Sequence, residues 1–427
     1  MNHFHRLPRA QRLEQLQEVC GLSSEDLDVL SGEKALPLDI AEHLIENVVG
    51  YFPIPLGIAT GFNINGRDVL VPMAVEETSI IAAASATAKW VRREGCIRTY
   101  SKGKLIIGQV QLPNVRNVQF TRRVLHEKRD LLMDLANATL PGLVKRGGGV
   151  RDLAIREIPR PSQDGTMVVL HILCDPCEAM GANLINQVCE ALKPKIEEFT
   201  GERVGLCILS NLVDTKLTVA EVIVRNIDTV VGKGIEEATL FAIADPYRAS
   251  THNKGILNGI DPILIATGND WRAVEAGVHT YAARSGKYQP LSTWKIDGAD
   301  LIGQIEIPLA VGTVGGVTKL HPTARVALKI LGIKSSEELA QICASVGLVQ
   351  NLGALKALAT VGIVKGHMHL HTSNLAIAAG AAIHEIAQVR EKLAEILRVE
   401  KRINLTHAKE VLEAIRDADK NEHAALL

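Results

Sequence analysis

One segment in the second half of the chain limits the fold more than any other, because it has the pattern of a helix with one apolar and one polar side. At about 100° per residue, a helix over residues 248–260 places four apolar side chains on one side: Ala249, Ile256, Leu257 and Ile260. The other side carries four polar side chains: Arg248, Thr251, Lys254 and Asn258. A guanidinium, a hydroxyl, an ammonium and an amide together suit an anionic substrate with a carbonyl group. A solvated helix face would have the same spacing.

A second helix is expected directly afterwards. Gly268-Asn269-Asp270 has the composition of an N-cap for a helix over residues 271–284. The whole chain has 427 residues, which exceeds the size of one hydrophobic core, so we expect two or three domains. Hydrophobic residues make up 47% of the chain and aromatic residues only 3%, which predicts aliphatic, alanine-rich cores suited to closely packed helices.

The charge and the apolar pattern argue against several classes of protein. A net charge of −1 disfavours a nucleic-acid-binding protein, which needs a basic face. The start of the chain, MNHFHRLPRAQRLEQLQE, lacks the apolar segment of a signal peptide. Gly, Pro and charged residues break every apolar run well short of the ~18 residues of a membrane span. We therefore expect a cytoplasmic protein without a membrane or nucleic-acid partner.

The seven cysteines do not form a disulfide framework, because their number is odd and they are scattered along the chain. Cys174 and Cys177 match C-x-x-C. No second pair and no suitably spaced histidine accompanies them, so incidental thiols in a reducing cytosol are favoured over a zinc or redox site.

The first hundred residues predict short helices and then a hairpin. Residues 8–45 have the pattern of short amphipathic helices. Residues 46–55 form an apolar loop punctuated by prolines, which is either an interface or a buried connection. Residues 58–75 predict a hairpin with Asn65-Gly66 as its turn. The hairpin leads to Glu76-Glu77-Thr78-Ser79 and a further helix, whose N-terminus favours nearby carboxylates.

Between residues 104 and 212, strand and helix patterns alternate as two β-α-β passages, which predicts a compact inserted α+β domain. No G-x-G-x-x-G follows a strand, so a Rossmann cofactor site is not supported. Met180-Gly181-Ala182-Asn183 stands at a helix start, where free backbone N–H groups could receive a phosphate. A lone glycine turn of this kind is more often structural.

The last third of the chain contains two patterns that resemble ligand sites without completing one. Residues 310–322 are glycine-rich but lack a final Gly-Lys-Ser/Thr, which favours close backbone packing over a P-loop. His367, His369 and His371 alternate as on one face of a strand, but no matching carboxylate set accompanies them, and we expect no metal.

Helices are expected around and after the histidines. Two are expected over residues 335–347 and 351–362, and charged amphipathic helices follow from about residue 376 to the end. Glycines near residues 362–366 suit a mobile C-terminal lid, although a docked helical tail fits equally well.

HNKGILNGID and ATGNDWRAVEAGVHTYAAR resemble the catalytic lysine and aspartate region of class II 3-hydroxy-3-methylglutaryl-CoA (HMG-CoA) reductases, and the similarity extends over nearly the whole chain. The resemblance implies an enzyme that interconverts HMG-CoA and mevalonate plus coenzyme A. Two successive hydride transfers with NADH or NADPH would pass through mevaldyl-CoA and mevaldehyde. The preferred nicotinamide and the direction of the reaction in the cell stay open.

The family's organisation implies an α+β fold with three parts. A helix-rich large domain, built around a central helix, would bind the acyl-CoA with residues 1–103 and 213–362. Residues 104–212 would be an inserted, ferredoxin-like NAD(P)-binding domain, and residues 363–427 a C-terminal helical flap. The resemblance also implies a homodimer, or a multiple of dimers, with shared active sites.

Four residues match the family's catalytic positions: Glu77, Lys254, Asp270 and His367. The Lys254 ammonium would stabilise the oxyanion that forms when hydride reaches the thioester carbonyl. Glu77 would exchange protons, and Asp270 would connect these groups by hydrogen bonds. His367 would protonate the departing CoA thiolate. Class I relatives take their lysine from a loop near Lys216, but this chain lacks their paired lysines, so we prefer Lys254.

The substrate-binding positions would be Ser79, Arg248, Thr251, Asn258, Gln350 and Asn351. The family's cofactor-binding DAMGAN loop is EAMGAN here, which implies cofactor contacts from Glu178, Met180, Gly181, Ala182 and Asn183. Glu178 in place of aspartate keeps the charge and lengthens the acidic side chain. Some NADH-preferring relatives have an aspartate where this chain has Leu140.

Two alternatives come from other classes of protein. A metal-dependent hydrolase would use the alternating histidines of residues 367–371 as ligands. A non-catalytic acyl-CoA-binding protein would use the same pocket without chemistry.

Overall fold

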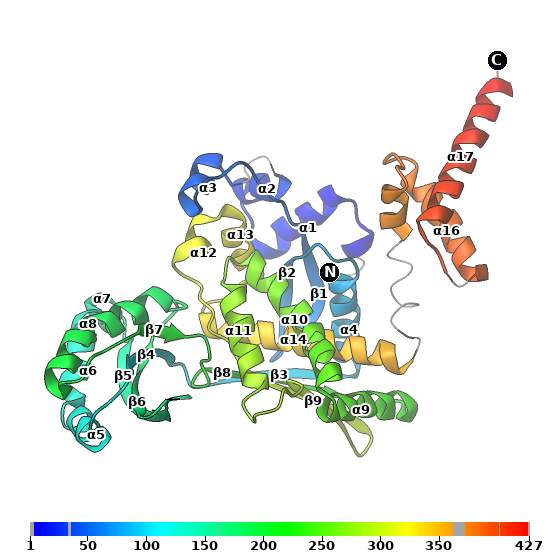
Figure 1. Cartoon of the computed structure of the whole chain (residues 1–427). Helices are drawn as coiled ribbons and strands as arrows, with labels where there is room; N and C mark the ends of the chain where they lie inside the picture. Colours follow the sequence, from blue (N-terminus) through cyan, green and yellow to red (C-terminus); the bar gives the residue numbers. More distant parts are fainter. Residues whose placement is uncertain are drawn as a thin grey trace.

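The computed structural model describes residues 4–32, 36–161, 163–360, 362, 372–400 and 402–425, with side chains up to residue 418. Two β-sheets are surrounded by helices, which confirms the predicted α+β class (Figure 1).

The larger sheet has six strands in the order β2-β1-β3-β8-β10-β9. The strands are β1 Leu56–Ile64, β2 Arg67–Ala74, β3 Gly95–Lys102, β8 Leu217–Val224, β9 Ser292–Asp297 and β10 Asp300–Pro308. All neighbours pair antiparallel except β1 and β3, which are parallel. The predicted hairpin is confirmed, since Asn65 and Gly66 connect β1 to β2 with positive φ angles of 50° and 82°.

The smaller sheet lies between β3 and β8 in the chain. Its order is β5-β6-β4-β7, and its strands are β4 Ile106–Leu112, β5 Gly149–Pro159, β6 Thr166–Asp175 and β7 Cys207–Ser210. Its helices are α5 Val118–Glu127, α6 Arg129–Ala138, α7 Pro141–Lys145 and α8 Ala182–Thr200. This is a β-α-β-β-α-β succession with a hydrophobic core of its own. Because Lys102 on β3 pairs with Leu217 on β8, the chain leaves and re-enters the larger sheet at adjacent strand ends.

Helices cover the larger sheet and form most of the main core (Figure 1). They are α4 Ile80–Glu94, α9 Thr229–Ala244, α10 Pro246–Ala266, α11 Trp271–Ala282, α12 Gly316–Leu320, α13 Pro322–Leu331 and α14 Ser336–Ala359. The N-terminal residues add η1 Phe4–Arg6, α1 Arg9–Cys20, α2 Ser24–Ser31 and α3 Leu38–Leu44, which confirms the short helices expected there.

The central helix of the prediction is α10, and it packs against α14 through glycines. A Cβ atom added at Gly259 would lie 2.8 Å from the carbonyl oxygen of Val346, and one at Gly347 would lie 2.9 Å from the Ile260 side chain. The prediction of two helices over residues 335–347 and 351–362 was wrong, because α14 runs through Gly347 without a break. The reason is that this glycine serves helix–helix contact rather than a turn.

Helix α14 is also the one helix in the described ranges that is long and apolar enough to cross a membrane by length and composition. Of its most apolar 18-residue window, 67% is buried inside the protein. Packing against α10, α4 and the sheet accounts for its apolar character.

The C-terminal segment forms α16 Ile386–Glu400 and α17 Leu405–Ala425, with a small core between them (Figure 1). The Glu385 carboxylate accepts hydrogen bonds from Arg416 Nε and Nη2, both at 2.8 Å, and connects the two helices. The helices are confirmed, whereas the flap function and the domain boundaries stay predictions.

Candidate active site

Lys254 and Glu77 form an ion pair on the polar face of α10. Lys254 Nζ lies 3.2 Å from Glu77 Oε2, and the two side chains are 61% and 49% exposed. An ammonium and a carboxylate that are both accessible can each reach a substrate. The structure therefore brings together two of the four predicted catalytic residues.

The turn between β2 and α4, which carries Glu77, contains one residue in a left-handed conformation. Ser79, the residue before α4, has a φ of 75° and makes no side-chain capping bond to the helix. A left-handed conformation is unfavourable for a residue with a Cβ, and such residues gather at functional sites. The Ser79 hydroxyl donates instead to the carbonyl of Thr78.

The predicted faces of α10 are confirmed. Ala249, Ile256, Leu257 and Ile260 are all buried. Thr251 is exposed, while Arg248 and Asn258 are half-buried on the Lys254 side. Asp245 caps the helix by accepting a hydrogen bond from the Tyr247 backbone N–H at 3.2 Å. Partial burial lowers the pKa of the Arg248 guanidinium, which favours an anionic partner there.

Gln350 and Asn351 of α14 are both buried, and their substrate contacts stay predictions. The Asn351 Oδ1 atom accepts hydrogen bonds from Ser292 Oγ at 2.9 Å and from Trp294 Nε1 at 2.8 Å. Ser292 Oγ also lies 2.7 Å from His252 Nε2. Burial lowers the pKa of His252 to about 4, so its imidazole is neutral. The buried Gln350 Oε1 and His252 Nδ1 atoms each lack a hydrogen-bond partner among the described residues.

Asp270 lies apart from the Lys254–Glu77 pair. It caps α11 by accepting from the Ala273 N–H at 3.1 Å, and its Oδ1 atom lies 3.3 Å from Arg272 Nη2. Twelve residues of α10, at about 1.5 Å each, place Lys254 roughly 18 Å along the helix from Ala266, and Asp270 follows beyond that end. Among the described residues of one chain, Asp270 bonds to neither Lys254 nor Glu77.

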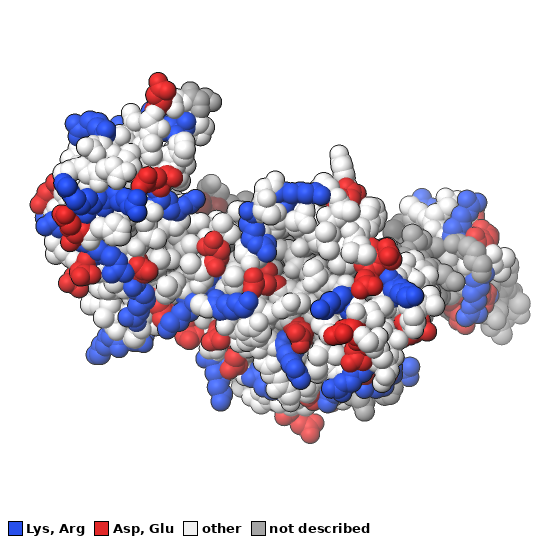
Figure 2. Space-filling view, turned by 90° about the horizontal axis from the view of Figure 1, so that it is seen from below, with Lys and Arg blue, Asp and Glu red and all other residues white. Residues whose placement is uncertain are grey.

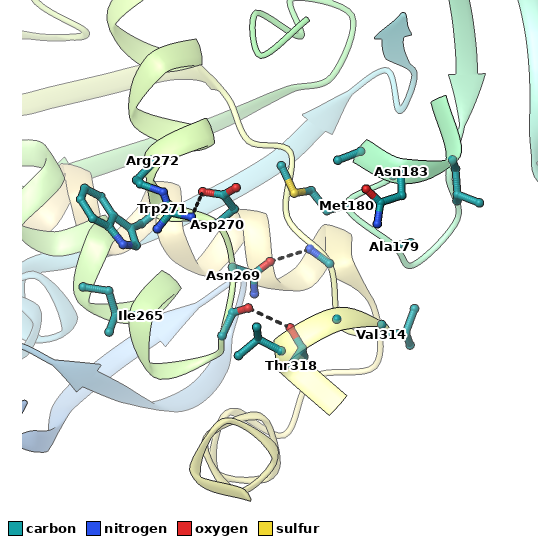
Figure 3. Close-up of a pocket in the computed structure, with 18 residues that line it drawn as sticks. Ala179, Met180, Asn183, Ile265, Asn269, Asp270, Trp271, Arg272, Val314 and Thr318 are labelled. Atoms are coloured by element: carbon teal, nitrogen blue, oxygen red, sulfur yellow. Dashed lines mark hydrogen bonds and ion pairs between the residues drawn. The ribbon is translucent and has the colours of Figure 1, made fainter. Parts of the chain in front are cut away.

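Asp270 lines a cavity of about 560 Å³, which lies where the domain of the smaller sheet meets the domain of the larger sheet (Figure 3). Three segments form its wall: residues 179–184, residues 265 and 268–272, and residues 312 and 314–318. Gly312 N donates to Asn269 Oδ1 at 2.8 Å, and Thr318 Oγ1 donates to the Gly268 carbonyl at 3.2 Å (Figure 3). These bonds hold the glycine-rich segment against the start of α11.

Four of the predicted cofactor residues, Met180, Gly181, Ala182 and Asn183, line this cavity. Gly181 precedes α8 with a φ of 96°, and no side chain caps the helix, so the first N–H groups of α8 have no helical partner. A Cβ at Gly181 would collide with the Ile106 side chain and lie 2.8 Å from Pro176 Cβ. An uncapped N-terminus of a 19-residue helix, facing a cavity of this size, suits the pyrophosphate of a dinucleotide.

Glu178, the fifth predicted cofactor residue, does not line this cavity. Its carboxylate accepts a hydrogen bond from the Ser336 backbone N–H at the start of α14. The longer acidic side chain of EAMGAN therefore connects the small domain to the large one.

The sequence reasoning missed several residues around the cavity. The glycine-rich segment 310–322 was assigned to close packing alone, and it does pack closely, since a Cβ at Gly312 would lie 2.6 Å from Met180 N. The same segment also forms one cavity wall. Arg272 and Trp271 line the cavity next to Asp270 (Figure 3). The GNDWR motif could have indicated Trp271 and Arg272, because it follows α10 directly and places both residues beside Asp270.

Two further predictions concern Lys216, the alternative catalytic lysine, and the alternating histidines of residues 367–371. Lys216 is buried near Asp175 and Glu178 and makes no ion pair with Glu77, which favours Lys254 as the residue of the site. His367, His369 and His371 lie outside the described residues. No group of three or more His, Cys, Asp or Glu side chains suited to a metal occurs in the described ranges.

Comparison with known proteins gives consistent matches. A family model described as hydroxymethylglutaryl-coenzyme A reductase matches residues 8–372. The 3-hydroxy-3-methylglutaryl-coenzyme A reductase of Archaeoglobus fulgidus is 46% identical over 418 residues, which cover 97% of this chain and 94% of that one.

Solved structures agree with this match. One of the Streptococcus pneumoniae 3-hydroxy-3-methylglutaryl-coenzyme A reductase has a TM-score of 0.82 and 40% identity, covering 97% of this chain and 99% of that chain. Another, of the class II enzyme from that organism bound to NADPH in open conformations, has a TM-score of 0.80 and 40% identity, covering 84% and 99%.

Fold and sequence together therefore define an oxidoreductase that acts on an acyl-coenzyme A. The chain belongs to the hydroxymethylglutaryl-coenzyme A reductase family, whose reaction is the reduction of HMG-CoA to mevalonate. Membership of this family decides against both alternatives, the metal-dependent hydrolase and the non-catalytic acyl-CoA-binding protein.

Proposed function

We propose that HMG-CoA is reduced beside the Lys254–Glu77 pair, and that a nicotinamide dinucleotide binds in the 560 Å³ cavity. The observation that carries this assignment is the 3.2 Å contact between Lys254 Nζ and Glu77 Oε2 on the polar face of α10. A fixed ammonium stabilises the negative charge that develops on a thioester carbonyl oxygen during reduction. Glu77, in contact with the ammonium, is placed to give and take protons at the same oxygen.

The substrate's free carboxylate is expected at Arg248. A guanidinium binds a carboxylate through two parallel N–H donors, and the half-buried position of Arg248 strengthens that interaction. Thr251 and Asn258, on the same side of α10, supply a hydroxyl and an amide for the tertiary alcohol and the carbonyl. Ser79 contributes a further hydroxyl from the α4 side.

The dinucleotide's pyrophosphate is expected at the uncapped N-terminus of α8, where Gly181 allows close approach. When bound, a reduced nicotinamide supplies one hydride, so the two reduction steps, through mevaldyl-CoA and mevaldehyde, would consume two molecules of the dinucleotide in turn. NADPH is bound in the Streptococcus pneumoniae relative, and Leu140 of this chain, which is buried, offers no carboxylate against a 2′-phosphate. These facts favour acceptance of NADPH without excluding NADH.

A second copy of the chain is expected to complete the site. If Asp270 acts with Lys254, it has to come from another subunit, because roughly 18 Å of helix separates Lys254 from the end of α10 within one chain. Large apolar side chains that are exposed on the single chain support a homodimer: Val49, Phe52, Val230, Phe241 and Tyr247. The C-terminal helices, with His367 before them in sequence, are proposed to close over the thiolate.

The proposal also includes a cytoplasmic setting without a nucleic-acid partner. None of the seven cysteines, all within the described ranges, forms a disulfide, which fits a reducing cytoplasm. Lys and Arg are interspersed with Asp and Glu on the face shown in Figure 2, which gives no support to a nucleic-acid partner.

One assay tests the proposal. Purified protein is given HMG-CoA with NADPH or NADH, and in separate reactions mevalonate plus coenzyme A with NADP⁺ or NAD⁺. We expect cofactor oxidation that depends on HMG-CoA, and the ratio of kcat/KM values identifies the preferred nicotinamide. Absence of turnover in all four reactions, by protein that is folded and dimeric, would contradict the proposal.

A further inference from the structure

A second cavity, of about 450 Å³, lies where the small domain joins the large one. Its wall includes Gly103 and Lys104, where the chain leaves β3, and Lys216 and Leu217, where it enters β8. The two connections pack tightly, since a Cβ at Gly103 would collide with the Thr215 carbonyl oxygen. This cavity shares no lining residue with the one at Met180–Asn183.

Lys216 is the unusual residue of this second cavity. It is only 8% exposed, yet its ammonium makes no hydrogen bond or ion pair with any described residue. A buried charge normally has a partner, because removing an ion from water is costly. Burial lowers the pKa of the Lys216 ammonium, which is the expected sign for a cation without a close counter-ion.

The nearby carboxylates already have partners of their own. Asp175 Oδ2 lies 2.6 Å from Lys104 Nζ, and Glu178 accepts the Ser336 backbone N–H. Glu337 Oε1 accepts from Gln341 Nε2 at 3.3 Å. All three carboxylates attract Lys216 at a distance, but none is within ion-pair range of it.

A second cation at the cavity is also without an acidic partner. Arg146 lines the wall and forms no ion pair among the described residues. Buried Lys216 from the large-domain side and exposed Arg146 from the small domain both line a space large enough for a small metabolite. The same space is also lined by the hydroxyl-bearing residues Ser335, Ser336 and Thr218 and by the carboxylates of Asp175, Glu178 and Glu337.

We propose that this cavity binds a small metabolite through an oxyanion group, phosphate or carboxylate, held by Lys216 and Arg146. The ligand would contact both domains at the two chain connections that join them. Binding there is separate from the proposed function, because it uses neither the Lys254–Glu77 pair nor the wall of the 560 Å³ cavity.

The test is thermal unfolding and calorimetric titration of the full-length protein with inorganic phosphate and, in parallel, with citrate, at constant ionic strength. Wild-type protein should show saturable binding of at least one of the two probes and a rise in Tm. Lys216→Met should weaken that binding by about tenfold or more, because a charged hydrogen bond is lost. Arg146→Gln should weaken it less, and exposed Lys295→Met should leave it unchanged. A preference for phosphate or citrate identifies the oxyanion.

Three outcomes would overturn the proposal. The first is no saturable binding of either probe by wild-type protein. The second is equal binding by wild type and Lys216→Met. The third is loss of the Lys216-dependent binding when NADPH is saturating, which would assign the cavity to the dinucleotide.

A stability measurement without added anion gives an independent check. Lys216→Met replaces an unpaired buried ammonium by an apolar group of similar length, so Tm should stay equal or rise. A clear fall in Tm would show that the surrounding carboxylates already hold Lys216 as an internal partner, which contradicts an anion site.

Discussion

The ammonium of Lys254 lies 3.2 Å from the carboxylate of Glu77, although 177 positions of sequence separate the two residues. Glu77 follows a strand of the N-terminal hairpin, and Lys254 lies on the central helix. The small domain occupies much of the sequence between them without taking part in the contact. The pair thus depends on the large sheet and α10 alone, and both side chains stay accessible from outside.

Lys254→Ala should reduce kcat for HMG-CoA reduction by about 10²-fold or more, because one preorganised donor to the oxyanion is lost. The fold should be nearly unaffected, since an exposed ion pair contributes only about 0–1 kcal/mol to stability. Steady-state kinetics and urea unfolding measure the two effects. Exposed Lys295→Ala on β9 is the matched control and should retain activity. Turnover near the wild-type value in Lys254→Ala would remove Lys254 from the mechanism.

A subunit-mixing experiment tests whether the site is shared. Lys254→Ala and Asp270→Asn proteins should each be inactive alone. After the two are mixed under conditions of subunit exchange, roughly a quarter of wild-type activity should return, because half of random dimers are mixed and each has one intact site. If Lys254 and Asp270 of the same chain acted together, the mixture would stay inactive. As a control, Lys254→Ala protein alone is taken through the same exchange conditions, and it should gain no activity.

The sequence predicted those parts of the site that local periodicity determines. The burial of Ala249, Ile256 and Ile260 follows from helical spacing, and the turn at Asn65-Gly66 follows from the φ angles that these residues tolerate. Gly347 misled the prediction, because a glycine that permits helix contact has the same local signal as one that ends a helix. Spacing along the chain cannot separate the two.

Contacts between distant segments were the part that spacing did not reveal. Nothing near Glu178 in sequence indicates that its carboxylate bonds to Ser336, or that Gly312 packs on Met180. Asn351 was predicted to contact the substrate, and spacing did not reveal that its side-chain oxygen accepts hydrogen bonds from Ser292 and Trp294 in the core. Such three-dimensional neighbours decide whether an amide faces a ligand or the interior.

Gly181→Ala should weaken binding of the dinucleotide and destabilise the small domain by about 1–3 kcal/mol, because the new methyl group meets Ile106 and Pro176 and the φ of 96° disfavours it. Fluorescence titration with NADPH and urea unfolding measure these losses. Gly286→Ala is the control for backbone strain alone, since its φ is 86° and nothing lies within 4 Å of the added Cβ. Equal effects of the two substitutions would show that the clash at the α8 start has no role.

Stability should fall with acid because of His252. Burial holds its pKa at about 4 in the folded protein, against about 6.5 when unfolded, so the unfolded chain binds more protons between these values. The free energy of unfolding therefore decreases as pH falls from about 6.5 to about 4, by on the order of 3 kcal/mol from this group. His252→Gln keeps a hydrogen-bonding group near Ser292 but cannot titrate, so its unfolding free energy should depend less on pH over this window.

Urea unfolding followed by tryptophan fluorescence at several pH values checks this difference, since the buried Trp294 belongs to the same hydrogen-bonded group as His252. The exposed His43 provides the matched substitution, His43→Gln, which should keep the wild-type dependence. Comparing variants with wild type cancels the contribution of the other titrating groups. If His252→Gln lost stability with acid as steeply as wild type and His43→Gln, the imidazole would not be the neutral, buried group that links α10 to Ser292.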